Sequence, residues 1–145
     1  MTLSAPPSLA RRYLKASVAF FVYGILIGLH ISSALHLGLG TFRGGYVAAH
    51  THVLLIGFVA MLLAGLALWR FPEPKPSSWI WLPEAAWWLL VLTVVGRSTS
   101  EILTGYFVWR GFGVGVFAIS CVQAFALGAL AVHLLGRMTF VRTAP

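Results

Sequence analysis

The sequence predicts an all-α integral membrane protein: a four-helix bundle forming a single membrane domain over residues 1–145, with both termini in the cytoplasm. Three observations predict it. Of the 145 residues, 59% are hydrophobic and only 9% are charged, against about 25% in a typical soluble domain. Four apolar runs reach the length of about 20 residues that crosses a bilayer. Lys and Arg gather at alternate ends of these runs, as the positive-inside rule requires.

The four predicted spans cover about residues 16–39, 46–69, 80–106 and 112–135. The short segments "GTFRGG", "RFPEPKPSSW" and "VWRG" separate them. The second of these is rich in proline, which ends helices and stiffens loops. The first run is too long for the core of a cleaved signal peptide, and its end, "HISSALHLG", is too polar.

The basic residues orient the spans. One side has Arg43 and Arg110; the other has Arg11, Arg12, Lys15, Arg70, Lys75, Arg137 and Arg142. Basic segments stay in the cytoplasm, so both termini are expected there, in a bacterial or archaeal cytoplasmic membrane. The basic residues form no patch interleaved with aromatics, so the expected environment is the lipid bilayer and no nucleic-acid partner is expected. Cys121 is the only cysteine, which excludes an internal disulfide.

The first two spans carry histidines in their outer halves. His30 and His36 lie in the first span, and His50 and His52 in the second. Residues two apart on a helix point about 200° away from each other. His50 and His52 therefore cannot comfortably chelate one ion, and we expect them to face different neighbours and to do different jobs.

The last two spans carry the remaining ionisable residues. Arg97 and Glu101 are spaced i, i+4 in the third span, a spacing at which an ion pair can form on one helix face. An unpaired charge facing lipid costs about 2.5–3.5 kcal/mol or more, so both should face the protein interior. His133 lies near the inner end of the fourth span, beside Arg137, where an interfacial role is expected.

Most of these polar groups fall in one layer. With a rise of about 1.5 Å per residue, His30, His36, His50, His52, Arg97 and Glu101 all lie within about 14 Å of the outer boundary. Each has a structural explanation, such as headgroup contact or hydrogen bonding between helices. As a layer they are functional candidates, because ionisable groups inside a bilayer are costly and neutral imidazole binds Zn, Cu and haem iron. Gly24 and Gly28 form a GxxxG motif, which predicts close helix contact.

The second span resembles a helix of a known family. The segment "AHTHVLLIGFVAMLLAGLALWRFP" resembles the second transmembrane helix of subunit I of the haem–copper superfamily, the respiratory oxygen reductases and their nitric oxide reductase relatives. In that family the helix starts on the outer side, carries a histidine in its first turns, continues with a glycine and aromatics, and often ends with a proline. His50-Thr51 and Gly57-Phe58 stand at the corresponding positions.

The resemblance implies haem b as the cofactor and His50 as a ligand to its iron. His36 matches His50 in depth and is the expected second metal ligand; alternatively, that position is open or filled by another chain. The outer arginines are the groups available to the propionates. The expected cofactor-binding residues are His50, His36, His52, His30, Arg43, Arg97 and Arg110.

The chain also departs from the family. Subunit I has about twelve spans, and the helix that carries its paired copper ligands has no counterpart among the four predicted here. We therefore do not expect the chain to reduce oxygen or nitric oxide alone, and any enzymatic role would be oxidoreductive. The expected function is electron transfer by a haem b-binding membrane protein, as a homo-oligomer or a subunit of a respiratory complex. The alternatives are a cofactor-free accessory subunit of a respiratory oxidase or nitric oxide reductase, and a small metal or anion transporter.

Overall fold

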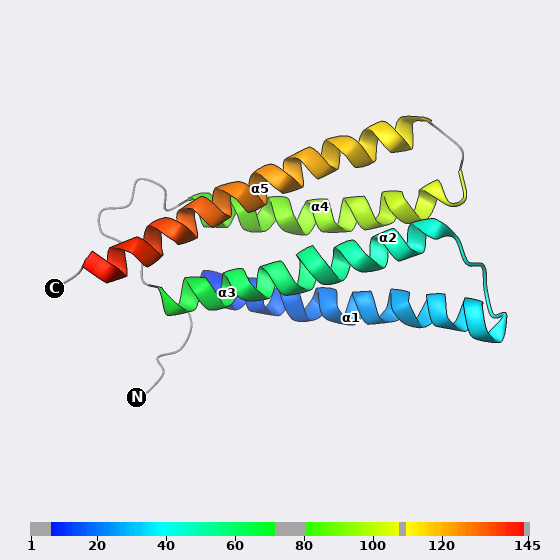
Figure 1. Ribbon diagram of the computed structural model, residues 1–145, viewed down its shortest axis with the longest axis horizontal. Coiled ribbons are helices and arrows are strands. Elements are labelled where there is room, and N and C mark those ends of the chain that lie inside the picture. Colours follow the sequence, from blue (N-terminus) through cyan, green and yellow to red (C-terminus); the bar gives the residue numbers. More distant parts are fainter. Residues whose placement is uncertain (1–6, 72–80, 108–109, 144–145) are drawn as a thin grey trace.

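The chain folds into long helices. The computed structural model describes residues 7–71, 81–107 and 110–143, with side chains for all of these except 110 and 139–143. No strand occurs within these ranges, so the predicted all-α class is confirmed. The helices are α1 (Ser8–Leu37), α2 (Gly44–His52), the π-helix η1 (Val53–Ala60), α3 (Met61–Arg70), α4 (Leu82–Thr104) and α5 (Arg110–Thr143). Helices α2, η1 and α3 follow one another without a break and form one rod (Figure 1).

Local sequence explains where these helices begin and end. Helix α1 starts after Pro7 and ends at Gly38, whose φ of 65° is the left-handed conformation that glycine adopts without strain. Pro83 lies in the first turn of α4, where the missing backbone N–H costs nothing.

Three helices are long and apolar enough to cross a membrane: Ser8–Leu37, Gly44–Arg70 and Gly111–Met138. They correspond to the first, second and fourth predicted spans, and the ends of the first lie closer to the N-terminus than predicted. The third predicted span is present as the helix α4, but it is less apolar because it carries Glu84, Arg97 and Glu101. A crossing by α4 therefore stays a prediction.

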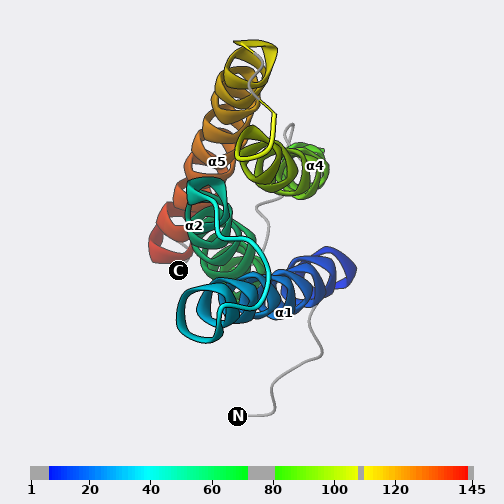
Figure 2. The ribbon, with the colours of Figure 1, turned by 90° about the vertical axis from the view of Figure 1, so that its right-hand side faces the viewer.

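The four rods form two antiparallel pairs that lie against each other (Figures 1 and 2). Helix α1 packs along the α2–η1–α3 rod, α4 packs along α5, and α2 and η1 contact α4. The start of α1 and the end of α5 lie at the same end of the bundle (Figure 1). The two linking segments between α1 and α2 and between α4 and α5 lie at the opposite end, which we call the hairpin end.

Glycines bring α1 and the second rod into close contact. A Cβ added to Gly57 would lie 2.7 Å from Cγ of Phe20, and one added to Gly65 would lie 3.0 Å from Cγ of Leu14. Because real Cβ atoms do not approach other carbons this closely, larger residues at these positions would push the helices apart. Phe20 is almost fully buried in this contact.

A polar cluster ties the start of α1 to the start of α4. Arg12 pairs with Glu84, and its guanidinium carbon lies 4.1 Å from the centre of the Trp87 ring, a cation–π distance. The buried Tyr13 donates its hydroxyl hydrogen to the carbonyl of Pro83 over 2.8 Å. These contacts fix the relative height of the two helix pairs.

The outer surface of the bundle is strongly apolar. Large side chains such as Leu29, Val114 and Phe125 are 61–71% exposed, and Val132 and Leu135 continue the series along α5. In water this surface would aggregate; hydrocarbon chains satisfy it. The structure therefore supports a membrane-embedded protein.

Candidate functional site

His50 and His52 point to opposite neighbours, as their spacing predicts. His50 lies against α1, where its Nδ1 donates a hydrogen bond to the carbonyl of Gly24 over 2.9 Å. His52 lies against α4, with its Nδ1 2.8 Å from one carboxylate oxygen of Glu101 and 3.0 Å from the other. The two rings thus belong to two different helix contacts.

The glycine motif of α1 makes room for His50. A Cβ added to Gly28 would lie 2.9 Å from Cε1 of His50, and one added to Gly24 would collide with the side chain of Leu54. The predicted close contact at Gly24 and Gly28 is therefore real, and its purpose here includes seating an imidazole against the α1 backbone.

The hydrogen bond to Gly24 also fixes the chemistry of His50. A carbonyl oxygen only accepts, so Nδ1 carries the hydrogen and the neutral ring holds its lone pair on Nε2. Nε2 has no hydrogen-bond partner among the described residues. The result is an oriented, neutral imidazole with one free electron pair, the form in which histidine binds a metal.

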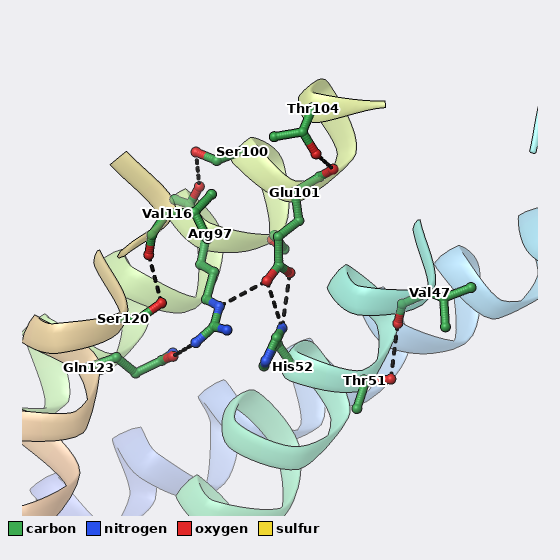
Figure 3. A network of polar contacts seen from close by, with 12 residues as sticks. Val47, Thr51, His52, Arg97, Ser100, Glu101, Thr104, Val116, Ser120 and Gln123 are labelled. Atoms are coloured by element: carbon green, nitrogen blue, oxygen red, sulfur yellow. Dashed lines mark hydrogen bonds and ion pairs between the residues drawn. The ribbon is translucent and has the colours of Figure 1, made fainter. Parts of the chain in front are cut away.

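His52 enters a polar network that joins three helices (Figure 3). Glu101 accepts from His52 on α2 and from Nε of Arg97 over 2.9 Å within α4. Arg97 then donates from Nη1 to Oε1 of Gln123 on α5 over 3.2 Å. The predicted i, i+4 pair of Arg97 and Glu101 is therefore present and faces the neighbouring helices.

The network is well shielded and electrically balanced. Glu101 is 7% exposed and Gln123 is 1% exposed, so these groups interact in a medium of low dielectric constant. Ionised Glu101 and Arg97 cancel, which leaves His52 neutral with its hydrogen on Nδ1 and its lone pair on Nε2. Nε2 of Gln123 is buried and has no hydrogen-bond partner among the described side chains.

A second polar cluster lies at the hairpin end. His30 donates from Nε2 to the carbonyl of Thr41 over 3.2 Å, and its ring lies 4.6 Å from the ring of Tyr46. The hydroxyl of Tyr106 is 2.9 Å from both the Thr41 hydroxyl and the Tyr46 hydroxyl. These contacts link α1, α2 and the residues after α4 at the mouth of the bundle.

The other expected site residues do not join His50. His36 lies exposed on the last turn of α1. Eight residues separate it from Gly28, or about 12 Å along the helix. Arg43 is exposed and lies beside Gly105, Arg97 is held by the network, and the side chain of Arg110 lies outside the described residues. The two-helix site expected from His36 and His50 is thus not brought together within this chain.

His133 occupies a site of its own on α5. Its Nε2 accepts a hydrogen bond from Nε of the buried Arg137 over 2.9 Å, and Arg137 also donates to the carbonyl of Phe71 over 3.0 Å. A largely apolar pocket of about 730 Å³ opens beside it, between α4 and α5. His133 is therefore part of a helix contact at the end where α5 terminates.

Sequence reasoning missed two parts of the site. Gln123 gave no signal, because a single amide in an apolar run has no spacing that points to a partner. The cluster of Thr41, Tyr46 and Tyr106 was also missed, although tyrosines at both hairpin-end segments were visible in the sequence.

Comparison with known proteins adds no assignment. No protein-family model matches the chain, and neither a curated protein nor a solved structure was found to be similar to it. Among the described residues, no three His, Cys, Asp or Glu side chains gather in a group that could hold a metal ion. Any metal at His50 would thus be bound with groups from outside this set.

Proposed function

We propose that the chain is a haem b-binding membrane protein of four spans, with both termini in the cytoplasm and His50 as an axial ligand. It would serve electron transfer, as a homo-oligomer or as a subunit of a respiratory complex, in a bacterial or archaeal cytoplasmic membrane. The family resemblance of the second rod and the state of His50 support the proposal.

The observation that carries the proposal is the hydrogen bond from His50 to Gly24. Ligating histidines commonly donate their other ring N–H to a carbonyl or carboxylate, which fixes the tautomer and raises the basicity of the ligating nitrogen. His52 lacks this arrangement in an apolar setting, because its N–H faces the charged Glu101. His50 is therefore the better ligand of the two.

Haem b, when bound, would supply a one-electron redox centre, and His50 would orient it beside α1. The chain itself provides one axial ligand, since His36 lies too far along α1 to face His50. The second position is then open or taken by a residue of another subunit. Arg43 is the cation free to meet a propionate at the hairpin end, because Arg97 is held by Glu101 and Gln123.

The four-span topology rests on how α4 hides its charges. Arg97 pairs with Glu101 inside the bundle, and Glu84 pairs with Arg12 at the end where α4 begins. Neither charge pair needs to meet hydrocarbon, so a helix of modest hydropathy can still cross. The excess of Lys and Arg on the side of the two termini favours a cytoplasmic location for that side. A reporter fused after Pro145 that reads as external would overturn this topology.

The spectrum of the purified protein tests the haem. We expect a Soret band in protein produced with ample haem, and its loss, or conversion to a five-coordinate high-spin form, in His50→Ala. His52→Ala is the matched control, because it removes an imidazole two residues away and should leave iron coordination intact. Colourless wild-type protein, or a parent spectrum retained in His50→Ala, would refute the proposal.

A cofactor-free accessory subunit of a respiratory oxidase or nitric oxide reductase is the second candidate. The network of His52, Glu101, Arg97 and Gln123 favours it, because a set of polar groups that bond to one another can serve only to hold helices together. This candidate predicts no Soret band and full association with a partner complex in His50→Ala.

A further inference from the structure

The network around Arg97 has more donors than acceptors. Arg97 carries five N–H groups, and the described contacts use one on Nε and one on Nη1. The buried Nε2 of Gln123 adds two more N–H groups without a partner among the described residues. On the acceptor side only the Nε2 lone pair of His52 is left, because both oxygens of Glu101 and Oε1 of Gln123 are already used.

These uncommitted groups lie together. In Figure 3 the guanidinium of Arg97 lies between the amide of Gln123 and the ring of His52. Gln123 is 1% exposed, so bulk solvent cannot satisfy its amide. An unsatisfied buried donor costs about 1–3 kcal/mol, which favours a small molecule that presents an oxygen to all three groups.

We infer that Gln123, Arg97 and His52 form a binding site for one buried water molecule. The water oxygen accepts hydrogens from Nε2 of Gln123 and Nη2 of Arg97, and one water hydrogen is donated to Nε2 of His52. This gives about three hydrogen bonds, the usual number for a buried water. Every N–H of the Gln123 amide that faces the site is then partnered.

Charge favours water over an anion at this site. Arg97 and Glu101 already cancel each other, so a chloride or nitrite ion would bring an uncompensated negative charge into a medium of low dielectric constant. The penalty for a buried, uncompensated ion is several kcal/mol. A neutral water avoids it and completes a chain of hydrogen bonds from α5 through His52 to Glu101. The inference does not depend on the haem proposal.

The sequence offers an unusually clean test. Gln123 is the only glutamine and the chain has no asparagine, so ¹⁵N-glutamine labelling gives a single side-chain NH₂ signal in the full-length protein. In nanodiscs we expect magnetisation transfer from water to these two protons, despite the burial of the amide. In His52→Phe, which removes the acceptor, the transfer should fall to the noise level. In His50→Phe, changed on the opposite side of α2, it should persist.

Three results would overturn the inference. The first is the absence of transfer from water in the wild-type protein, a measurement that needs no variant and so survives any folding defect. The second is transfer that stays undiminished in His52→Phe. The third is a shift of the Gln123 signal when chloride is exchanged for a bulky anion, since this would identify the occupant as an anion.

Discussion

The two sides of the second rod hold similar histidines in opposite states. On the α1 side, His50 meets a glycine-lined backbone and donates to a carbonyl. On the α4 side, His52 meets the carboxylate of Glu101, which is itself held by Arg97. One partner is neutral and leaves a nitrogen free to bind; the other is charged and ties the ring into a helix contact. The comparison shows that the neighbouring helix determines what a membrane histidine can do.

Removal of Glu101 should produce the largest effect on this comparison. Glu101→Ala leaves the Arg97 charge and the N–H of His52 without their acceptor, and breaking a buried pair in this way costs about 3–5 kcal/mol. Arg97 is partly exposed, so a loss near 3 kcal/mol in the free energy of unfolding is expected. Unfolding in detergent mixtures, followed by circular dichroism, measures it.

Glu84→Ala is the control for that experiment. Its pair with Arg12 is 36–44% exposed, and exposed pairs contribute about 0–1 kcal/mol. Equal losses in the two variants would show that burial does not distinguish the network from the pair at the other end of α4.

The α1 side should respond next, through Gly28. In Gly28→Ala the new Cβ would lie 2.9 Å from Cε1 of His50, so the ring must move away from its carbonyl. Overpacking of this kind costs about 1–3 kcal/mol, and any haem spectrum should change with it. Gly113→Ala is the matched control, because nothing lies within 4 Å of its added Cβ, and it should gain about 0.5–1 kcal/mol from higher helix propensity. Identical stability changes in the two variants would contradict the seating of His50 against Gly28.

The smallest effect is expected at the hairpin end. Tyr106→Phe removes the hydroxyl shared by Thr41 and Tyr46, and a single exposed hydrogen-bonding group contributes about 0.5–1.5 kcal/mol. Tyr23→Phe provides the control, because the Tyr23 hydroxyl makes no hydrogen bond among the described residues. Amide hydrogen exchange at the end of α4 should quicken in the first variant and stay unchanged in the second.

Periodicity alone predicted several of these features. The opposite directions of His50 and His52 follow from about 100° per residue, and the pair of Arg97 and Glu101 follows from the i, i+4 spacing. Both depend only on the geometry of one helix. The fold class and three apolar spans followed from composition in the same way.

Features that depend on which helices are neighbours could not be predicted. Depth counting placed His36 and His50 in one layer, but it is blind to rotation about the helix axis and to where α1 meets the second rod. Gln123 is 26 residues from Arg97, and nothing in the sequence indicates that distance. The π-helical turns of η1 gave no signal either, since their residues are those of any apolar span.

The π-helix η1 gives the second rod a tolerance that its flanks lack. Its hydrogen bonds close over five residues instead of four, so Val53–Ala60 holds more residues per turn than the α-helices on either side. Deletion of one residue there can be absorbed by tightening a wide turn, which keeps the histidines and the Gly65 face in phase. The same deletion within Met61–Arg70 would rotate everything beyond it by about 100°. Gains and losses of single residues during evolution should therefore be accommodated in the segment directly after His52.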